Sequence, residues 1–126
     1  MTADPTITVV NRYRLTAGAE AFVAVVTAMA RRVETEGHLG VRSYHFFRAD
    51  GEGRAVVTYD SPEAWVGHHD IAMGWPEMAA VRAVSDLEEI ALYGPFSDAM
   101  RAWLEKAKLL GRLRQAGEAV TGFRRS

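Results

Sequence analysis

The stretch Val56–Asp70, VVTYDSPEAWVGHHD, decides how the rest of the chain is arranged. Its first four residues are typical of a β-strand, and the aspartate, serine and proline that follow end that strand. Ser61 suits the N-cap of a helix, and Pro62 suits the first helical turn. Residues three apart share a helix face, so Trp65 and His68 lie side by side. The sequence therefore predicts a strand and then a helix with an aromatic ring beside a titratable imidazole.

Alternating and helical patterns on both sides of this stretch predict the other elements. In the first strand one side is mostly apolar and contains a single polar residue, Asn11. Residues 50–53, DGEG, are typical of the turn of a β-hairpin. The expected elements, in order, are strand 6–15, helix 19–36, strands 41–48 and 54–60, a helix from Ser61 that breaks near residues 74–76, a short helix 77–84 and strand 87–93.

This order of strands and helices predicts an α+β fold of the ferredoxin-like βαββαβ type, with one four-stranded antiparallel sheet and helices on one side. The other side of the sheet is left open and carries apolar residues such as Val10, and such a surface is usually covered by a partner. We therefore expect a homodimer. The predicted organisation is a flexible N-terminal tail at 1–5, the ferredoxin-like domain at 6–96, and a C-terminal helix and basic tail at 97–126.

The C-terminal part of the chain predicts an extra helix. It begins at Ser97 and ends at Gly111 or Gly117. Its apolar stripe consists of Met100, Trp103, Leu104, Ala107 and Leu110. Residues 101–126 contain seven Lys and Arg against two Glu, which fits either a solvated basic helix with a frayed tail or a helix that packs Trp103 on another subunit. No aromatic and basic sheet motif accompanies this charge, so we expect no nucleic-acid binding.

The composition excludes several classes of site. The chain has 126 residues, 48% of them hydrophobic and 25% charged, with a formal net charge of −1 and no cysteine. Disulfides, thiolate metal sites and cysteine nucleophiles are therefore excluded. The four histidines have no HxxxH spacing, so we expect no metal site. No glycine-rich nucleotide motif, signal peptide or apolar run of membrane-spanning length is present, and the expected localisation is cytoplasmic.

Four short motifs resemble the antibiotic biosynthesis monooxygenase family, and together they cover about residues 7–96. They are LTAGAEAF after the first strand, EGHLGVRSY between helix and strand, YDSPEAWVGH, and the closing LYGPFS. The third is the most specific, because its tyrosine, serine, alanine and histidine have the intervals of the family. The second departs from the family pattern at Leu39, where proline is frequent. The resemblance implies a dimeric α/β barrel built from ferredoxin-like subunits.

The resemblance also implies a function, namely oxidation of a small phenolic or quinol-like compound with dioxygen and without a cofactor. Deprotonation makes such a substrate electron-rich, so the protein must supply a base, hydrogen bonds and a dry pocket. The expected catalytic residues are His68, as the proton acceptor, and Asn11. The residues expected around the substrate are Trp65, Tyr44, Tyr59, Tyr13, Met73 and Trp75. Met73 occupies the position at which many members have a second histidine.

Two other functions remain open. NRYRLTAG resembles the start of a heme-degrading branch of the same family, whose asparagine corresponds to Asn11, but no histidine stands where its axial ligand is expected. Heme is therefore possible but disfavoured. The second alternative is an accessory protein that binds a small ligand without catalysis. In that case His68 is a structural histidine, and Trp65 belongs to the core. His69 is expected to face solvent.

Overall fold

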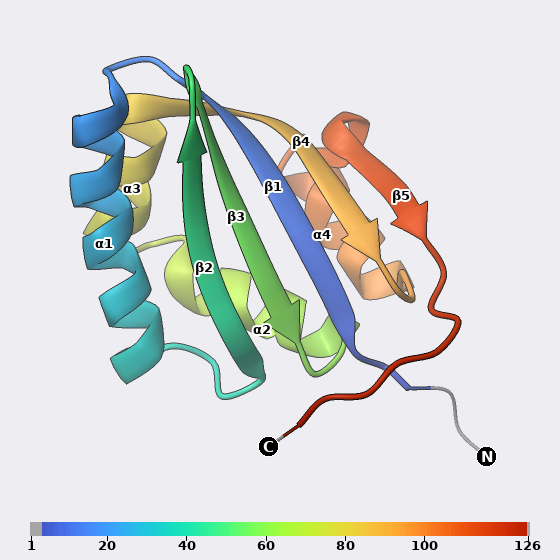
Figure 1. The fold of residues 1–126 in the computed structure, drawn as a ribbon. Coiled ribbons are helices and arrows are strands. Elements are labelled where there is room, and N and C mark those ends of the chain that lie inside the picture. The colour runs from blue at the N-terminus through green and yellow to red at the C-terminus, as the bar shows by residue number, and fades with distance from the viewer. Residues whose placement is uncertain (1–3, 126) are drawn as a thin grey trace.

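The computed structural model describes residues 4–125 and contains one mixed sheet with all its α-helices on one side (Figure 1). The elements, in chain order, are β1 (Ile7–Leu15), α1 (Ala19–Glu36), β2 (Val41–Ala49), β3 (Glu52–Tyr59), α2 (Pro62–Ala72), α3 (Pro76–Val84), β4 (Ser85–Tyr93), α4 (Asp98–Lys106), the short 3₁₀ helix η1 (Leu110–Arg112) and β5 (Leu113–Gly117). Within the described residues, none of the helices has the length and apolar character needed to cross a membrane. Of the predicted tail at 1–5, residues 1–3 lie outside the described part.

The strand order β2-β3-β1-β4-β5 confirms the predicted βαββαβ core and corrects the number of strands. Strands β1 to β4 pair antiparallel, as the sequence predicts. The prediction of a purely antiparallel four-stranded sheet is wrong, because β5 adds a fifth strand that pairs parallel to β4. The C-terminal part is therefore joined to the sheet rather than being only a helix and a tail.

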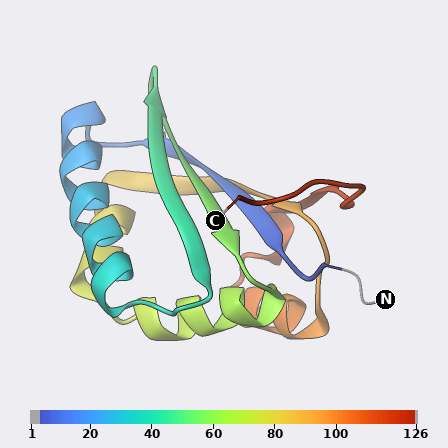
Figure 2. The ribbon, with the colours of Figure 1, turned by 60° about the horizontal axis from the view of Figure 1, so that its bottom comes forward.

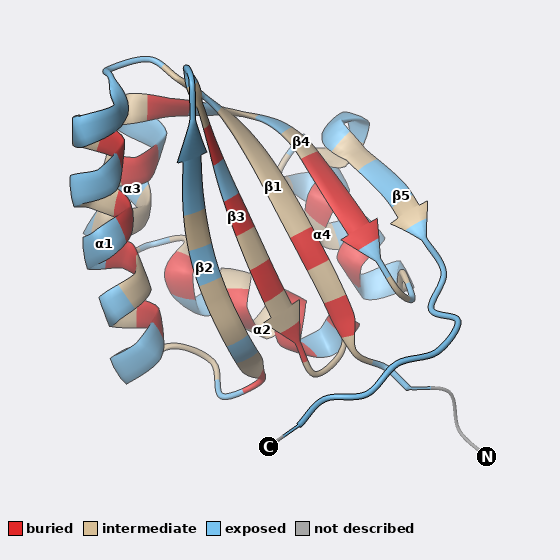
Figure 3. Ribbon diagram, viewed as in Figure 1, coloured by how far each residue is buried: buried red, intermediate tan, exposed pale blue. Residues whose placement is uncertain are grey.

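Alternation along the strands divides the sheet into a covered and an open side, as Figure 3 shows by burial. On β1, Ile7 and Val9 are 0% and 1% exposed and pack in the main core, under α2 and α4. A second core joins α1 to α3, with Phe22 and Met29 at its centre. Figure 2 shows α2 and α4 below the sheet and α1 beside it at the left. Any cavity between the sheet and these helices is thus walled by elements that are distant in sequence.

The helix α2 begins where the sequence predicts. The backbone N–H of Ala64 donates to Ser61 Oγ at 3.1 Å, and Pro62 occupies the first turn. This N-cap satisfies a backbone donor that the helix itself leaves without a partner. It also fixes the residue at which α2 begins.

The helix α4 ends earlier than predicted, because Lys108 has a left-handed backbone conformation with φ 61°. The N–H of Leu109 donates to the carbonyl of Leu104 at 2.8 Å, and the N–H of Lys108 donates to that of Glu105 at 3.1 Å. This is the Schellman arrangement, which usually has glycine at the position of Lys108. The turn brings Leu109 onto the main core and redirects the chain toward β5.

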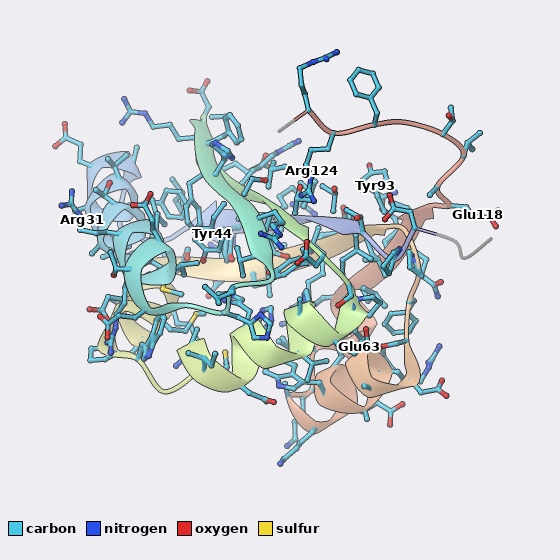
Figure 4. The ribbon with its side chains drawn as sticks, turned by 90° about the horizontal axis from the view of Figure 1, so that it is seen from below. Arg31, Tyr44, Glu63, Tyr93, Glu118 and Arg124 are labelled. Carbon is cyan, nitrogen blue, oxygen red and sulfur yellow. The ribbon has the colours of Figure 1, made fainter. Side chains whose placement is uncertain are left out.

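The open side of the sheet is crossed at one end by residues 118–125, which follow β5 (Figure 1). Figure 4 shows Arg124 and Tyr93 on the side of the sheet opposite Glu63 of α2. Arg124 lies 3.8 Å from a carboxylate oxygen of Asp60, at the end of β3. Because this contact is between exposed groups, its contribution to stability is small.

Candidate active site

A cavity of about 780 Å³ lies between the covered side of β1 and β4 and the helices α2, α3 and α4. Its size is that of a site for a small organic ligand. Two indole rings, of Trp65 and Trp103, contribute apolar walls. Four uncharged polar side chains, those of Asn11, Tyr13, His69 and Ser85, also line it. The cavity thus combines aromatic surface with a few hydrogen-bonding groups.

His69 lines this cavity and has one ring nitrogen, Nε2, without a hydrogen-bond partner among the described residues. Its Nδ1 lies 2.8 Å from the carbonyl oxygen of Trp65, one helical turn earlier. A carbonyl only accepts hydrogen bonds, so Nδ1 carries the proton and Nε2 of the neutral ring is left as an acceptor. Burial lowers the pKa of His69 from 6.5 to about 4, against the opposing effects of the Trp65 carbonyl and of Asp70. The imidazole is therefore neutral at pH 7 and able to accept a proton.

Two tryptophans cover the His69 ring. The Trp65 ring lies 4.0 Å from it between centroids, at an interplanar angle of 35°, and the Trp103 ring lies 5.1 Å away. The Nε1–H of Trp103 donates to Asp70 Oδ1 at 3.1 Å, which ties α4 to the end of α2. The sequence left open whether Trp103 packs on another subunit, and in the structure it packs within its own chain. These contacts restrict the position of the His69 imidazole.

Asn11 supplies a second acceptor to the cavity. Its Nδ2 donates to the hydroxyl oxygen of Tyr13 at 3.3 Å, two residues along the same side of β1. Its Oδ1 is buried and has no hydrogen-bond partner among the described residues. A buried acceptor without a partner is costly, which makes it a candidate for a ligand donor. Burial also raises the pKa of Tyr13, so its hydroxyl stays neutral.

His68 lies outside the cavity, in a separate cluster with two tyrosines. Its ring is 5.8 Å from that of Tyr44 and 5.9 Å from that of Tyr59, and it is only 2% exposed. Within the described chain its Nδ1 has no hydrogen-bond partner. Burial, with a smaller contribution from His69 and His38, lowers the pKa of His68 to about 3. This cluster packs behind the cavity rather than in it.

The predicted site residues thus fall into two groups. Asn11, Tyr13, Trp65 and Met73 line the cavity together. The remaining four lie elsewhere, and they are His68, Tyr44, Tyr59 and Trp75. Tyr44 borders a different groove, of about 810 Å³, between α1 and β2.

Trp75 lies apart from the cavity and also from the cluster of His68, Tyr44 and Tyr59. It stacks under the guanidinium of Arg32, whose carbon lies 4.4 Å from the ring centroid. Its ring packs on the second core, between α1 and α3.

Among the cavity residues that sequence reasoning missed are two aromatic ones, His69 and Trp103. His69 is expected to face solvent, but in the structure it is partly buried and lines the cavity. Its spacing of four residues from Trp65 was a usable signal, since such residues are neighbours on a helix. Trp103 had no comparable signal, because the docking of α4 on α2 depends on tertiary packing. Within residues 4–125, no group of three or more His, Asp or Glu side chains is placed to bind a metal ion.

Comparisons with known proteins agree on the fold. No family profile and no curated protein sequence matches this chain. MupZ from Pseudomonas fluorescens superposes with a TM-score of 0.67 at 17% identity, over 99% of this chain and 93% of MupZ. A mutant of SnoaB, a cofactor-independent oxygenase from Streptomyces nogalater, gives a TM-score of 0.62 at 21% identity, over 75% of this chain and 96% of SnoaB.

A third solved structure carries the family name. It is a protein from Caulobacter crescentus that is provisionally assigned as an antibiotic biosynthesis monooxygenase. It superposes with a TM-score of 0.59 at 20% identity, over 71% of this chain and 86% of its own. The chain therefore shares the fold of the antibiotic biosynthesis monooxygenases, as the resemblance in its sequence predicts.

Proposed function

We propose that this chain is a monooxygenase that oxidises a small phenolic or quinol-like compound with dioxygen and uses no cofactor. The observation that carries the proposal is the cavity that places two acceptors, His69 Nε2 and Asn11 Oδ1, beside aromatic walls. A hydroxyl group on an aromatic ring matches both features. SnoaB, which has the same fold, is a cofactor-independent oxygenase, and this supports the reaction class.

We assign the base to His69 rather than to His68, because His69 lines the cavity and His68 does not. Full proton transfer from an ordinary phenol, of pKa about 10, to an imidazole of pKa about 4 costs about 8 kcal/mol. Attraction between the resulting charges returns about 4 kcal/mol at an effective dielectric constant of 20. About 4 kcal/mol of cost remains, so only a small fraction of the bound substrate is the anion at any moment, and compounds with more acidic hydroxyl groups form more of it.

The reaction balances without an external reductant. The hydroxyl proton passes to His69, and the substrate anion gives one electron to dioxygen, forming a substrate radical and superoxide. Their combination makes a carbon–oxygen bond, and the peroxide then takes up the proton. The ring carbon that carries the hydroperoxide then loses its C–H proton as the O–O bond breaks, which leaves one oxygen atom on the ring as a quinone carbonyl and releases the other, with this proton, as water. The substrate supplies all four electrons, and the apolar walls exclude bulk water.

The test is oxygen uptake on a panel of hydroquinones, with the same incubation under nitrogen as the blank. Removal of a general base typically costs about a hundredfold in rate, so His69→Gln is expected to lose most turnover. His45→Gln removes an exposed imidazole on β2 and is expected to retain it. Full turnover in a folded His69→Gln variant would remove His69 from this role.

Two other functions compete with this proposal. If no compound in the panel supports oxygen uptake while one raises the melting temperature, the chain is a ligand-binding protein without catalysis. If added heme shifts its Soret band in the wild type but not in His69→Gln, the free Nε2 is an axial ligand instead. The sequence disfavours heme, since no histidine occupies the position of the family's axial ligand.

We also propose that a second copy of the chain covers the open side of the sheet. Phe47 of β2 and Tyr93 of β4 are 55% and 45% exposed, and Phe123 of the terminal segment is 84% exposed. Apolar surface of this kind is usually buried by association. Light scattering coupled to gel filtration is expected to give a dimer mass. A monomer mass at every concentration would contradict the proposal.

A further inference from the structure

Charged side chains border the cavity where it meets solvent, and their pairing is uneven. They are Arg14, Arg82, Asp86, Glu88 and Arg112. Both acidic residues already have cationic partners. Arg14 donates to a carboxylate oxygen of Asp86, and Arg12 Nη1 donates to Glu88 Oε1 at 3.1 Å. The negative charge at this opening is therefore neutralised by the protein itself.

Two of the arginines have no such partner. Among residues 4–125, no ion pair includes Arg82 or Arg112. Arg82 Nη1 lies 4.0 Å from the uncharged Sδ of Met73. Arg82 is in the last turn of α3 and Arg112 is in η1, so the two guanidinium groups come from different walls of the cavity. The opening thus has an excess of positive charge in a chain whose formal net charge is −1.

We propose that the ligand of this cavity is an aromatic compound with an anionic substituent, which binds to Arg82 and Arg112. Guanidinium groups match the planar, two-oxygen geometry of a carboxylate, and charge-assisted hydrogen bonds of this kind are strong. The aromatic ring then lies against Trp65 and Trp103, with its hydroxyl group toward Asn11. This orientation rests on the function proposed above, whereas the preference for an anion rests on the arginines alone.

A matched pair of fluorescent probes separates charge from aromatic surface. Anilinonaphthalene sulfonate carries a sulfonate, and N-phenylnaphthylamine has the same ring system without it. We expect the sulfonate to bind at least about tenfold more tightly, which corresponds to about 1.4 kcal/mol. The difference is expected to shrink with added salt, because exposed charges are screened over about 10 Å at 0.1 M.

Substitutions locate the effect. Arg82→Gln and Arg112→Gln are each expected to reduce the preference for the sulfonate severalfold, and the double variant to abolish it. The affinity for N-phenylnaphthylamine stays the same in all three. Arg48→Gln removes an exposed arginine at the tip of the β2–β3 hairpin, which borders neither the cavity nor the groove between α1 and β2. This variant is expected to bind both probes as the wild type does.

Equal affinity of the wild type for the two probes would overturn the proposal, and so would an undiminished preference in the double variant. Failure of the sulfonate to bind at all would also overturn it. These results are independent of turnover. Preference for the anion without oxygen uptake would support this inference and contradict the proposed monooxygenase function. Oxygen uptake without that preference would support the function and contradict this inference.

Discussion

Replacing Trp103 by alanine is expected to raise the pKa of His69. Burial is the main cause of the fall in the pKa of His69 from 6.5 to about 4. This fall corresponds to about 3.4 kcal/mol against the charged form of the ring. Trp103 covers one side of the imidazole at 5.1 Å, so its removal returns roughly half of this cost, about 1.7 kcal/mol. The same ring attracts the imidazolium by about 0.5 to 1 kcal/mol, and that attraction is lost. Desolvation is the larger effect, and the pKa is expected to reach about 5.

The assay is an NMR titration of the histidine ring protons, with the His69 signal assigned from its disappearance in His69→Gln. Trp103→Phe is the matched control, because it keeps an aromatic ring on this side of the imidazole and removes the hydrogen bond to Asp70. Its His69 pKa is expected to stay near that of the wild type. A His69 pKa that is unchanged or lower in a folded Trp103→Ala variant would refute the argument that this indole keeps water from the imidazole.

Three further predictions concern stability. The pKa values of His68 and His69 are about 3 and about 4 in the fold and near 6.5 in the unfolded chain, so below pH 6.5 the unfolded chain binds more protons. The free energy of unfolding in urea should therefore be highest above pH 6.5 and fall toward pH 4 by up to about 1.4 kcal/mol per pH unit for each histidine; a flat profile would contradict the burial of both. Ser61→Ala should lower that free energy by about 1 kcal/mol at pH 7 through loss of the N-cap of α2, with no loss expected if the Ser61 hydroxyl were idle. Lys108→Gly should raise it by up to about 1 kcal/mol, since glycine adopts φ 61° without strain, and a decrease in the urea midpoint would argue against the left-handed turn.

The elements that were predicted correctly from the sequence are those whose signals come from residues close together in the chain. Apolar alternation in β1, helical spacing in α1 and the N-cap of α2 each depend on neighbours in sequence, and the structure contains all three. The end of α4 was missed because the left-handed position is occupied by Lys108 instead of glycine, which would have marked it. β5 was missed because LRQAG has no strand pattern, and its pairing with β4 is a tertiary effect.

The candidate site was predicted in part for the same reason. Asn11 stands out in the sequence as a polar residue on an apolar strand face, and it lines the cavity. The choice between the adjacent histidines depends on the rotation of α2 relative to the sheet. Sequence spacing placed His68 beside Trp65, but the helix turns His68 toward Tyr44 and presents His69 to the cavity. No pattern within the helix itself fixes that rotation.

The attachment of residues 97–117 at one margin of the sheet has a consequence for how such proteins diversify. This segment contributes Trp103, Leu104, Leu109 and Arg112 to the chamber, yet it pairs only with β4. A segment of different length or polarity in this place would change the shape of the cavity and of its opening. The hydrogen bonds among β1 to β4 would stay the same. A protein with this sheet can thus change which ligands its cavity binds by changing only the C-terminal segment. The strands that position Asn11 need not change.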